Sequence, residues 1–453
     1  MNKLRLYQEQ DVNEILKHDS LGVFNEQRTG KTPTSLYALN KKCSGRILIV
    51  ATASMVYKWR DEAETWTDRQ VLIYDGTPKN RTKVLDEYNK DFKSILIISY
   101  GLIKTTKRYT GLKDELKDIL IMGLIVDEVH RAVGRKTANF IALRSMTHIP
   151  YRLYLTGTPA PNHPSQVWSI LTMIYPKGFT SYWRFVEEFF HLDIVRLPYS
   201  APVDNIKKPA DFLPNMEDKY VNLLDKYAIM RKRKDVMPWL PDEEEPTKIR
   251  LPLTRAQTKY LKELEKYYET EHVIAQGVLD QLLRYRQICL APELLDLKGN
   301  SPKIEWLQQF IADYPDDKII IFSRFTRFIH ILKKKLTNVE VMVGSTPLAK
   351  RNDLINNFQS GKLNVLIIQI DTGKEGITLD SADKLIFTDI YPPASDILQA
   401  KDRLVATSPE RNKPKEIIEL MMADSYDEAL FNLVKEKIEL TDIANSYINY
   451  VKE

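Results

Sequence analysis

Short runs of apolar residues recur along the chain, and mixed polar segments of helix length separate them. In chain order the runs lie at 47–52, 71–74, 95–99, 124–127, 152–157, 319–323, 339–344, 365–369 and 384–389. Runs this apolar are typical of strands that are buried on both faces of a parallel sheet. Their alternation with helix-length segments predicts two parallel-sheet α/β domains.

The region 191–300 breaks this pattern. It carries a basic run at 231–234, several prolines, and an amphipathic stretch at 257–288. We interpret the region as a basic linker and a mostly helical insertion. The expected domains are therefore residues 1–190 and residues 301–453, the second ending in helices.

Composition narrows the class of protein. The chain has 453 residues, and at roughly 100–200 residues per domain this suggests two or three domains. A net charge of +5 permits a polyanionic partner without requiring one. Cys43 and Cys289 are far apart and no Cys/His cluster has ligand spacing, which argues against a disulfide scaffold or a zinc site and favours a reducing cytosol. No apolar run approaches the length of a membrane span, and we expect no membrane partner.

The segment FNEQRTGKTPTS (24–35) contains the end of a phosphate-binding loop. LGVF (21–24) predicts a short strand before the loop, and the residues after it predict a helix, an order that lets backbone N–H groups face phosphates. Lys31 would reach the β- and γ-phosphates, and the Thr32 hydroxyl would bind Mg²⁺. Asn25 occupies the usual position of the first glycine and is the non-glycine residue that best tolerates positive φ. Taken alone, the trio GKT could also be a surface turn.

Two carboxylates end the apolar run LIVDEVH (124–130). Asp127 could hold Mg²⁺ directly or through water, and Glu128 could orient and deprotonate an attacking water. Phosphoryl transfer needs both roles, together with neutralisation of charge. A solvated acidic turn is the alternative for this pair alone, but a position downstream of a GKT loop favours the nucleotide site.

These motifs belong to an ordered series that resembles the Swi/Snf-type ATPases, which are superfamily-two DNA translocases and helicases. The segments that carry the resemblance lie at 4–10, 25–32, 48–66, 97–103, 127–130, 155–171, 230–241, 282–295, 301–307, 319–326, 371–387 and 391–406. The resemblance implies two RecA-like lobes, with ATP and Mg²⁺ as cofactors in the cleft between them.

The resemblance also assigns roles to single residues. The implied nucleotide contacts are Gln8 at the adenine, Arg28, Thr29, Gly30, Lys31 and Thr32 in motif I, and Gln399 and Arg403 in motif VI. Catalysis is assigned to Lys31, Asp127, Glu128 and Arg403, with Mg²⁺ on Thr32 and Asp127. Motif VI resembles Q-x-x-x-R-x-x-R, yet Ala406 stands at the second arginine. Arg403 could suffice, Arg411 could substitute, or the chain could be a weak or inactivated hydrolase.

Sequence-nonspecific DNA is the implied partner, because motors of this type grip phosphates. The candidate contacts are Thr52, Ser54, Lys58, Ser323, Arg324 and Thr372, although each could be an ordinary cap or a solvated residue. His130, Thr156 and Thr158 match the positions that couple the γ-phosphate to lobe closure. The basic run 231–234 could act at DNA or at a hinge, or be a solvated face.

The leading hypothesis is an ATP-dependent translocase on duplex or branched DNA, with branch migration or fork remodelling in recombination, repair or replication. The short chain and its Q-R-T-G-K-T motif are similar to phage or bacterial members, so we expect a cytoplasmic location in a bacterium or an infected host. A 3′–5′ unwinding helicase and an ATP-gated DNA clamp with weak hydrolysis are the alternatives. Branch migration needs a wedge that separates strands or a surface that recognises a junction, and the aromatic-rich segment 181–190 and the region 190–300 are the candidates. The alternative is that the aromatic side chains of 181–190 pack inside the domain.

Overall fold

A computed structural model describes residues 3–53, 55–104, 115–116, 119–161, 163–196, 205–237, 245–276, 278–373, 379–389 and 415–432. The chain divides into two compact units between Met237 and Pro238, which we call the first and the second domain. This division falls inside the region 191–300, which the sequence pattern assigns to a linker and insertion. The physical reason is that strands from this region join both central sheets.

The first domain contains a seven-stranded sheet in the order β3-β4-β2-β5-β6-β1-β9, and every neighbouring pair is parallel. Its strands are β1 (Ser20–Val23), β2 (Arg46–Ala51), β3 (Val71–Tyr74), β4 (Ile95–Ser99), β5 (Ile121–Val126), β6 (Tyr151–Leu155) and β9 (Ala228–Ile229). All six residues of β2 are buried, because helices cover both faces of the sheet.

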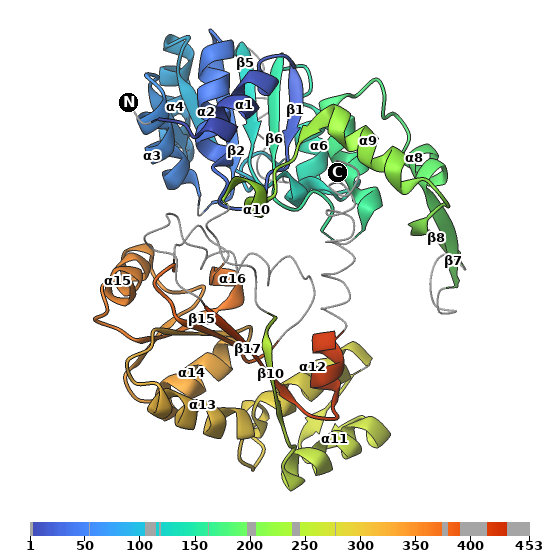
Figure 1. Ribbon diagram of the computed structural model, residues 1–453, viewed down its shortest axis with the longest axis vertical. Helices are drawn as coiled ribbons and strands as arrows, with labels where there is room; N and C mark the ends of the chain where they lie inside the picture. The colour runs from blue at the N-terminus through green and yellow to red at the C-terminus, as the bar shows by residue number, and fades with distance from the viewer. Residues whose placement is uncertain are drawn as a thin grey trace. The chain divides into compact units, whose positions relative to one another are not determined.

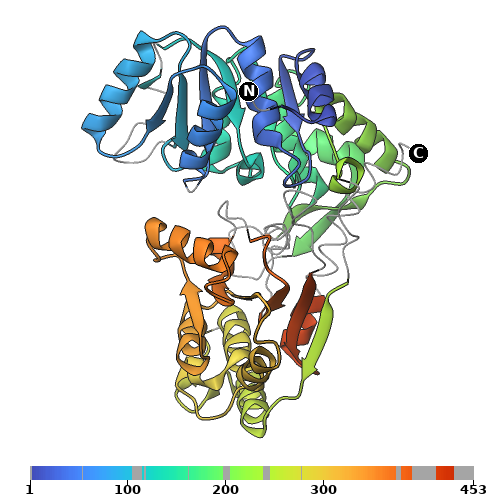
Figure 2. The ribbon, with the colours of Figure 1, turned by 60° about the vertical axis from the view of Figure 1, so that its left-hand side comes forward.

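Two hydrophobic cores flank this sheet. One face is covered by α1 (Leu6–Ile15), α2 (Lys31–Lys42) and α3 (Val56–Trp66). The other face is covered by α4 (Pro78–Lys90), α6 (Ala138–Arg144), α7 (Trp168–Ile174), α8 (Tyr182–Phe189) and α9 (Glu217–Tyr227) (Figures 1 and 2). Short helices η1 (Val129–Ala132), η2 (Pro164–Val167) and α10 (Arg233–Val236) complete the domain.

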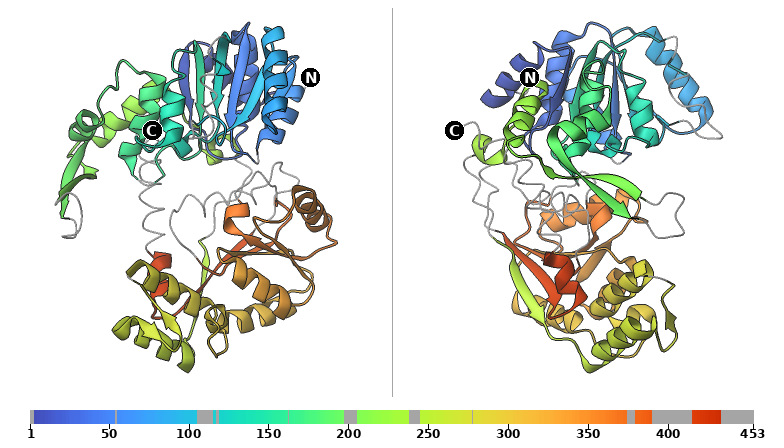
Figure 3. Two further views of the ribbon diagram at one scale, coloured as in Figure 1. Left: turned by 180° about the vertical axis from the view of Figure 1, so that it is seen from behind. Right: turned by 90° about the vertical axis from the view of Figure 1, so that its right-hand side faces the viewer.

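An antiparallel hairpin extends from the end of α8. It consists of β7 (Phe190–Arg196) and β8 (Asn205–Phe212), which pair with each other outside the seven-stranded sheet (Figure 3). The aromatic segment before it packs inward: Phe185, Phe189 and Phe190 are buried and contact Tyr220. The packing interpretation of this aromatic-rich segment therefore holds for these side chains.

The second domain is built on a six-stranded parallel sheet in the order β10-β17-β16-β13-β15-β14. Its strands are β10 (Thr247–Leu251), β13 (Ile319–Ser323), β14 (Val339–Met342), β15 (Val365–Gln369), β16 (Lys384–Phe387) and β17 (Glu416–Met422). One face is covered by α13 (Pro302–Asp313) and α14 (Thr326–Lys335), and the other by α15 (Leu348–Gln359) and α16 (Ile370–Gly373). The prediction of two parallel-sheet α/β domains is confirmed.

A smaller unit with its own core precedes α13 in the second domain. Its elements are α11 (Arg255–Tyr267), β11 (Glu269–Thr270), β12 (Val273–Ile274), α12 (Val278–Leu290) and η3 (Pro292–Leu295). The amphipathic stretch 257–288 is therefore two helices around a tight hairpin, because positive φ at Tyr268 and Glu271 ends the first helix. Within the described residues, no helix is both long and apolar enough to cross a bilayer.

Candidate functional site

The predicted site residues of the first domain gather at one edge of its sheet. Strands β5, β6 and β1 are parallel neighbours, so their carboxyl ends meet at the same edge. The phosphate loop follows β1, the carboxylates Asp127 and Glu128 follow β5, and Thr156 follows β6. Ligands of open parallel α/β sheets bind at this edge of the strands.

The lysine of the phosphate loop forms hydrogen bonds with the backbone of the same loop. Gly30 has φ 80° and precedes the first residue of α2, and a Cβ there would lie 2.1 Å from Gln8 Nε2. Lys31 Nζ donates to the carbonyl oxygens of Asn25 at 2.8 Å and of Glu26 at 3.0 Å. The left-handed residues of the loop are Arg28, with φ 65°, and Gly30, so the tolerance of asparagine for positive φ is not used at Asn25.

Gln8 and Thr29 brace this loop from two sides. Gln8 Oε1 accepts from the Arg5 amide at 2.8 Å, which caps α1, and its Nε2 lies 3.5 Å from the carbonyl oxygens of Thr29 and Gly30. Thr29 Oγ1 donates to the Glu26 carbonyl at 2.8 Å, and Thr32 is half-buried in the first turn of α2. Gln8, Thr29 and Thr32 thus lie in or against the phosphate loop, and their contact with a nucleotide stays a prediction.

Asp127 is held by three groups. Trp59 Nε1 donates to Oδ2 at 2.8 Å, the Glu128 amide donates to Oδ1 at 3.0 Å, and the Tyr100 hydroxyl donates to the Asp127 carbonyl at 2.8 Å. Burial, followed by the neighbouring charge of Glu128, raises the pKa of Asp127 to about 6. A nearby cation, such as a bound Mg²⁺, would favour the ionised form.

Glu128 has a left-handed backbone with φ 49°, and of its two carboxylate oxygens only Oε1 has a hydrogen-bond partner among the described residues. Gln27 Nε2 donates to Oε1 at 3.1 Å, and His130 Nδ1 lies 3.2 Å from Oε2. Burial alone would raise the pKa of Glu128, but the close contact and charge of His130, with Lys31 and Gln27, lower it to about 2. Gln27 and the left-handed backbone thus fix the direction of this carboxylate.

The three predicted coupling residues form one chain with Glu128. His130 Nδ1 lies 3.0 Å from Thr156 Oγ1, and that oxygen accepts from the Thr158 amide at 3.0 Å. Thr156 is fully buried, and Thr158 Oγ1 is buried without a hydrogen-bond partner among the described residues. A buried hydroxyl without a partner costs free energy, so an additional acceptor at this position would stabilise the site.

These groups suit a magnesium nucleotide. Within the described ranges, no cluster of three or more His, Cys, Asp or Glu side chains could hold a metal by itself. Mg²⁺ on Thr32 and Asp127 would therefore need phosphate and water oxygens, which is how this ion usually binds in phosphoryl-transfer sites. When bound, MgATP would supply the phosphoryl group, and Lys31 and the amino end of α2 would neutralise its charge.

The predicted DNA contacts differ in exposure. In the first domain Thr52 is half-buried and Lys58 is exposed. In the second domain Ser323 and Thr372 are buried, and Ser323 Oγ donates to Asp389 Oδ1 at 2.6 Å. The Ser323 hydroxyl is thus directed into the domain, and the surface role expected from the sequence does not suit it. Ser54, Gln399, Arg403, Ala406 and Arg411 lie outside the described residues.

Asp389 organises the carboxyl edge of the second sheet. It accepts hydrogen bonds from Ser323 Oγ, from the Arg324 amide at 3.1 Å and from Thr388 Oγ1 at 3.2 Å, and Arg286 Nη2 lies 3.5 Å from it. These contacts fix the backbone of Arg324. The DNA contact expected of its side chain stays a prediction.

Gln27 and Trp59 contact the two site carboxylates but were not predicted to be site residues from the sequence. Gln27 lies inside motif I, but no pattern shows that its amide faces Glu128, a residue 101 positions away. Trp59 offered a better signal, because a buried indole N–H usually needs a hydrogen-bond partner. Its position in the helix after β2 would have pointed to the adjacent strand end that carries Asp127.

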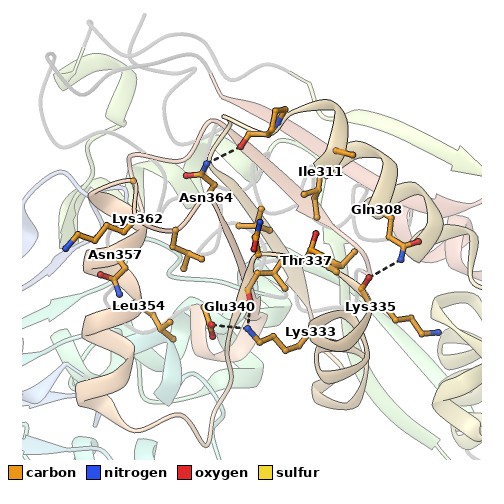
Figure 4. Close-up of a pocket in the computed structure, with 18 residues that line it drawn as sticks. Gln308, Ile311, Lys333, Lys335, Thr337, Glu340, Leu354, Asn357, Lys362 and Asn364 are labelled. Atoms are coloured by element: carbon orange, nitrogen blue, oxygen red, sulfur yellow. Dashed lines mark hydrogen bonds and ion pairs between the residues drawn. The ribbon is translucent and has the colours of Figure 1, made fainter.

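The second domain contains a surface depression (Figure 4). It is found at the amino ends of β14 and β15 and is lined by residues that include Gln308, Lys333, Lys335, Asn357, Lys362 and Asn364. Lys333 pairs with Glu340 at 2.9 Å, and Gln308 donates to the Lys335 carbonyl at 3.0 Å. Because ligands of parallel sheets bind at the opposite edge, we place the candidate site in the first domain and not here.

Curated relatives cover nearly the whole chain at low identity. Chromodomain-helicase-DNA-binding protein 1-like of Danio rerio is 25% identical over 92% of this chain and 41% of its own length. Nuclear protein STH1/NPS1 of Saccharomyces cerevisiae is 24% identical over 95% of this chain and 33% of its own length. The chain therefore spans less than half the length of these relatives.

A solved structure of the Sulfolobus solfataricus SWI2/SNF2 ATPase core in complex with dsDNA is 20% identical to this chain. It aligns over 99% of this chain and 94% of its own, with a TM-score of 0.44, a likeness too weak to support an argument about fold or function.

Two family models match consecutive parts of the chain. The SNF2-related domain matches residues 7–294, which include the phosphate loop and the Asp127–Glu128 pair, and the Helicase conserved C-terminal domain matches residues 302–406. The first model alone covers more than half of the chain, so this protein belongs to the SNF2-related family.

Proposed function

We propose that this chain is an ATP-dependent translocase that acts on duplex or branched DNA. The observation that carries the proposal is the gathering of Lys31, Asp127 and Glu128 at one edge of the first sheet, in a chain of the SNF2-related family. The proposed cofactors are ATP and Mg²⁺, and the proposed partner is DNA bound through its phosphates. Relatives named as helicase-DNA-binding proteins support this partner.

The proposed division of labour follows from the contacts. Lys31 leaves the carbonyl oxygens of Asn25 and Glu26 and binds phosphate instead. Asp127 holds the metal, with its orientation fixed by Trp59. Glu128 orients the attacking water, with its Oε1 held by Gln27 and its Oε2 beside His130. Such positioning and charge stabilisation supply most of the catalysis in phosphoryl transfer.

The test is ATP hydrolysis by the whole chain, titrated with single-stranded, duplex and four-way-junction DNA. The proposal expects stimulation by duplex or junction DNA, with Lys31→Ala as the inactive control. Hydrolysis that none of the three DNAs stimulates would defeat the motor, although a clamp could still bind DNA under ATP.

Branch migration is the finer form of the proposal. The Q-R-T-G-K-T form of motif I supports a member similar to the branch-migration enzyme of a T-odd coliphage. The β7–β8 hairpin is a candidate wedge, because it stands outside the central sheet and exposes 67% of Ile194. Movement of a four-way junction without displacement of a strand from a simple fork would favour branch migration. Displacement of a 3′-tailed strand would favour the conventional helicase.

The clamp alternative depends on Ala406. An arginine that stabilises the transition state contributes about 10³–10⁵ to the rate in other phosphoryl-transfer systems. We therefore compare DNA-stimulated hydrolysis by the natural chain and by Ala406→Arg. A large gain in the variant would support a weak hydrolase, and equal rates would show that position 406 does not limit turnover.

A further inference from the structure

An ion pair between a buried carboxylate and a half-buried arginine lies beside the phosphate loop. Asp11 on α1 is fully buried, and its Oδ1 accepts from Arg231 Nε and Nη2, both at 2.9 Å. Its Oδ2 accepts from Asn25 Nδ2 at 2.8 Å. One carboxylate thus joins α1, the first residue of motif I and the basic run of the presumed linker. Removing one partner of such a pair leaves an uncompensated buried charge.

The backbone of the same basic segment runs along the loop. The Phe24 amide donates to the Ile229 carbonyl at 2.8 Å, and the Glu26 amide donates to the Arg231 carbonyl at 3.0 Å. In return, the Arg233 amide donates to Glu26 Oε2 at 2.7 Å. Residues 229–233 are therefore attached to residues 24–26 by three hydrogen bonds as well as by the Asp11–Arg231 pair.

The loop residues attached in this way are the ones that hold Lys31. The carbonyl oxygens of Asn25 and Glu26 accept from Lys31 Nζ, while the Asn25 side chain and the Glu26 amide contact Asp11 and Arg231 respectively. A phosphate that attracts the Lys31 ammonium would remove the positive charge next to the carbonyl oxygens of Asn25 and Glu26. The Asn25 side chain is bonded to Asp11, and the Glu26 amide is bonded to the Arg231 carbonyl, so a shift of either loop residue would move its partner. Residues 229–233 are the last part of the first domain before the chain enters the second.

We propose that Asp11 and Arg231 are positioning residues that set the shape of the phosphate loop and link its occupancy to residues 229–233. The inference rests on the proposed function, because it requires a nucleotide on this loop. It also reassigns the first arginine of the basic run: Arg231 serves the loop from within the first domain, and it is not a contact for DNA phosphates.

The first experiment measures binding of a fluorescent ATP analogue with Mg²⁺, without DNA, to the whole chain and its variants. We expect Arg231→Ala to weaken binding by about tenfold, which corresponds to about 1.4 kcal/mol. The matched control is Lys234→Ala, which removes an exposed cation from the same basic run and should leave nucleotide affinity within about twofold of wild type. DNA affinity without nucleotide should be unchanged in Arg231→Ala.

Two further arms keep the test decisive. Arg231→Lys retains the positive charge but not the contact through two nitrogen atoms, so its nucleotide affinity should lie between those of Arg231→Ala and wild type. It also replaces Arg231→Ala if that variant does not fold. Hydrogen exchange should show that a nonhydrolysable ATP analogue alters the protection of residues 229–233 in wild type and less so in the arginine variant. A purely structural role would not produce this nucleotide-dependent difference.

The possible results distinguish a failure of the proposed positioning role of Asp11 and Arg231 from a failure of the proposed function. If wild type binds no nucleotide, the proposed function fails. If wild type binds nucleotide but folded Arg231 variants bind it within twofold of wild type, the inference is overturned. It is also overturned if nucleotide leaves the exchange of residues 229–233 unchanged, or if Arg231→Ala loses DNA affinity in the absence of nucleotide.

Discussion

The indole Nε1 of Trp59 donates a hydrogen bond of 2.8 Å to Oδ2 of Asp127, across 68 positions of sequence. Trp59 is fully buried in α3, and Asp127 directly follows the central strand β5. The bond aims the carboxylate that is proposed to hold Mg²⁺. Groups that orient a metal ligand in this way commonly affect metal affinity as much as 10–100-fold.

Trp59→Phe should therefore weaken the response to magnesium. Phenylalanine keeps most of the buried ring but removes the donor, so we expect the Mg²⁺ concentration for half-maximal ATP hydrolysis to rise about tenfold. The matched control is Trp66→Phe on the same helix, whose indole bonds to Glu62 at 3.1 Å and not to the site. Equal magnesium curves for the two variants would contradict the proposed role of Trp59.

Gln27→Ala should lower kcat for ATP hydrolysis and leave the KM for ATP nearly unchanged. Gln27 donates to the ionised Glu128 at 3.1 Å, and a hydrogen bond to a charged group contributes about 1.5–3 kcal/mol, or about 10–100-fold in rate. Steady-state kinetics measure both constants, and Gln308→Ala in the second domain serves as a remote glutamine control. A change confined to KM would show that Gln27 binds nucleotide and does not position Glu128.

Asp11→Asn should change the pH dependence of stability. Burial raises the pKa of Asp11 above its ordinary value of 3.8, although Arg231 and Asn25 act to lower it. The folded protein therefore binds this proton more tightly than the unfolded chain, and stability falls as the pH rises from about 4 through the raised pKa. Asparagine does not titrate, so the Tm of Asp11→Asn relative to wild type should increase over this range and then level off. A decrease would contradict the sign of the shift.

Ser323→Ala should reduce stability more than DNA binding. Ser323 Oγ is buried and donates to Asp389 at 2.6 Å, so its loss should cost about 1–3 kcal/mol in the free energy of unfolding. Chemical denaturation measures this cost, with the exposed Ser360→Ala as control. Loss of DNA affinity in a folded Ser323→Ala protein, with unchanged stability, would restore the surface role inferred from the sequence.

The central strands of both sheets could be predicted because they are buried on both faces. The runs at 95–99 and 319–323 coincide with the interior strands β4 and β13. The edge strands β9 and β10 were not predicted from the sequence, because β9 has only two residues and β10 alternates polar with apolar side chains. Such strands are defined by the neighbour they pair with and not by their own composition.

The candidate site was predictable where one local motif carries the chemistry. Lys31 and Asp127 follow from the loop and the strand that bear them. The partners of these residues do not, because Gln27 meets Glu128 and Arg231 meets Asp11 only after distant segments fold together. The basic run illustrates the limit: its charge left a DNA contact, a hinge and a solvated face open, whereas Arg231 is paired with a buried carboxylate.

Translocation itself is tested most directly by displacement of a third strand from a DNA triplex in a blunt duplex. A protein that moves along duplex DNA should release the triplex-forming strand with ATP and Mg²⁺, and it should fail to do so with a nonhydrolysable analogue. Glu128→Gln, which should still bind ATP, serves as the matched control and should release nothing. Hydrolysis of ATP stimulated by duplex DNA without release of the third strand would contradict the account.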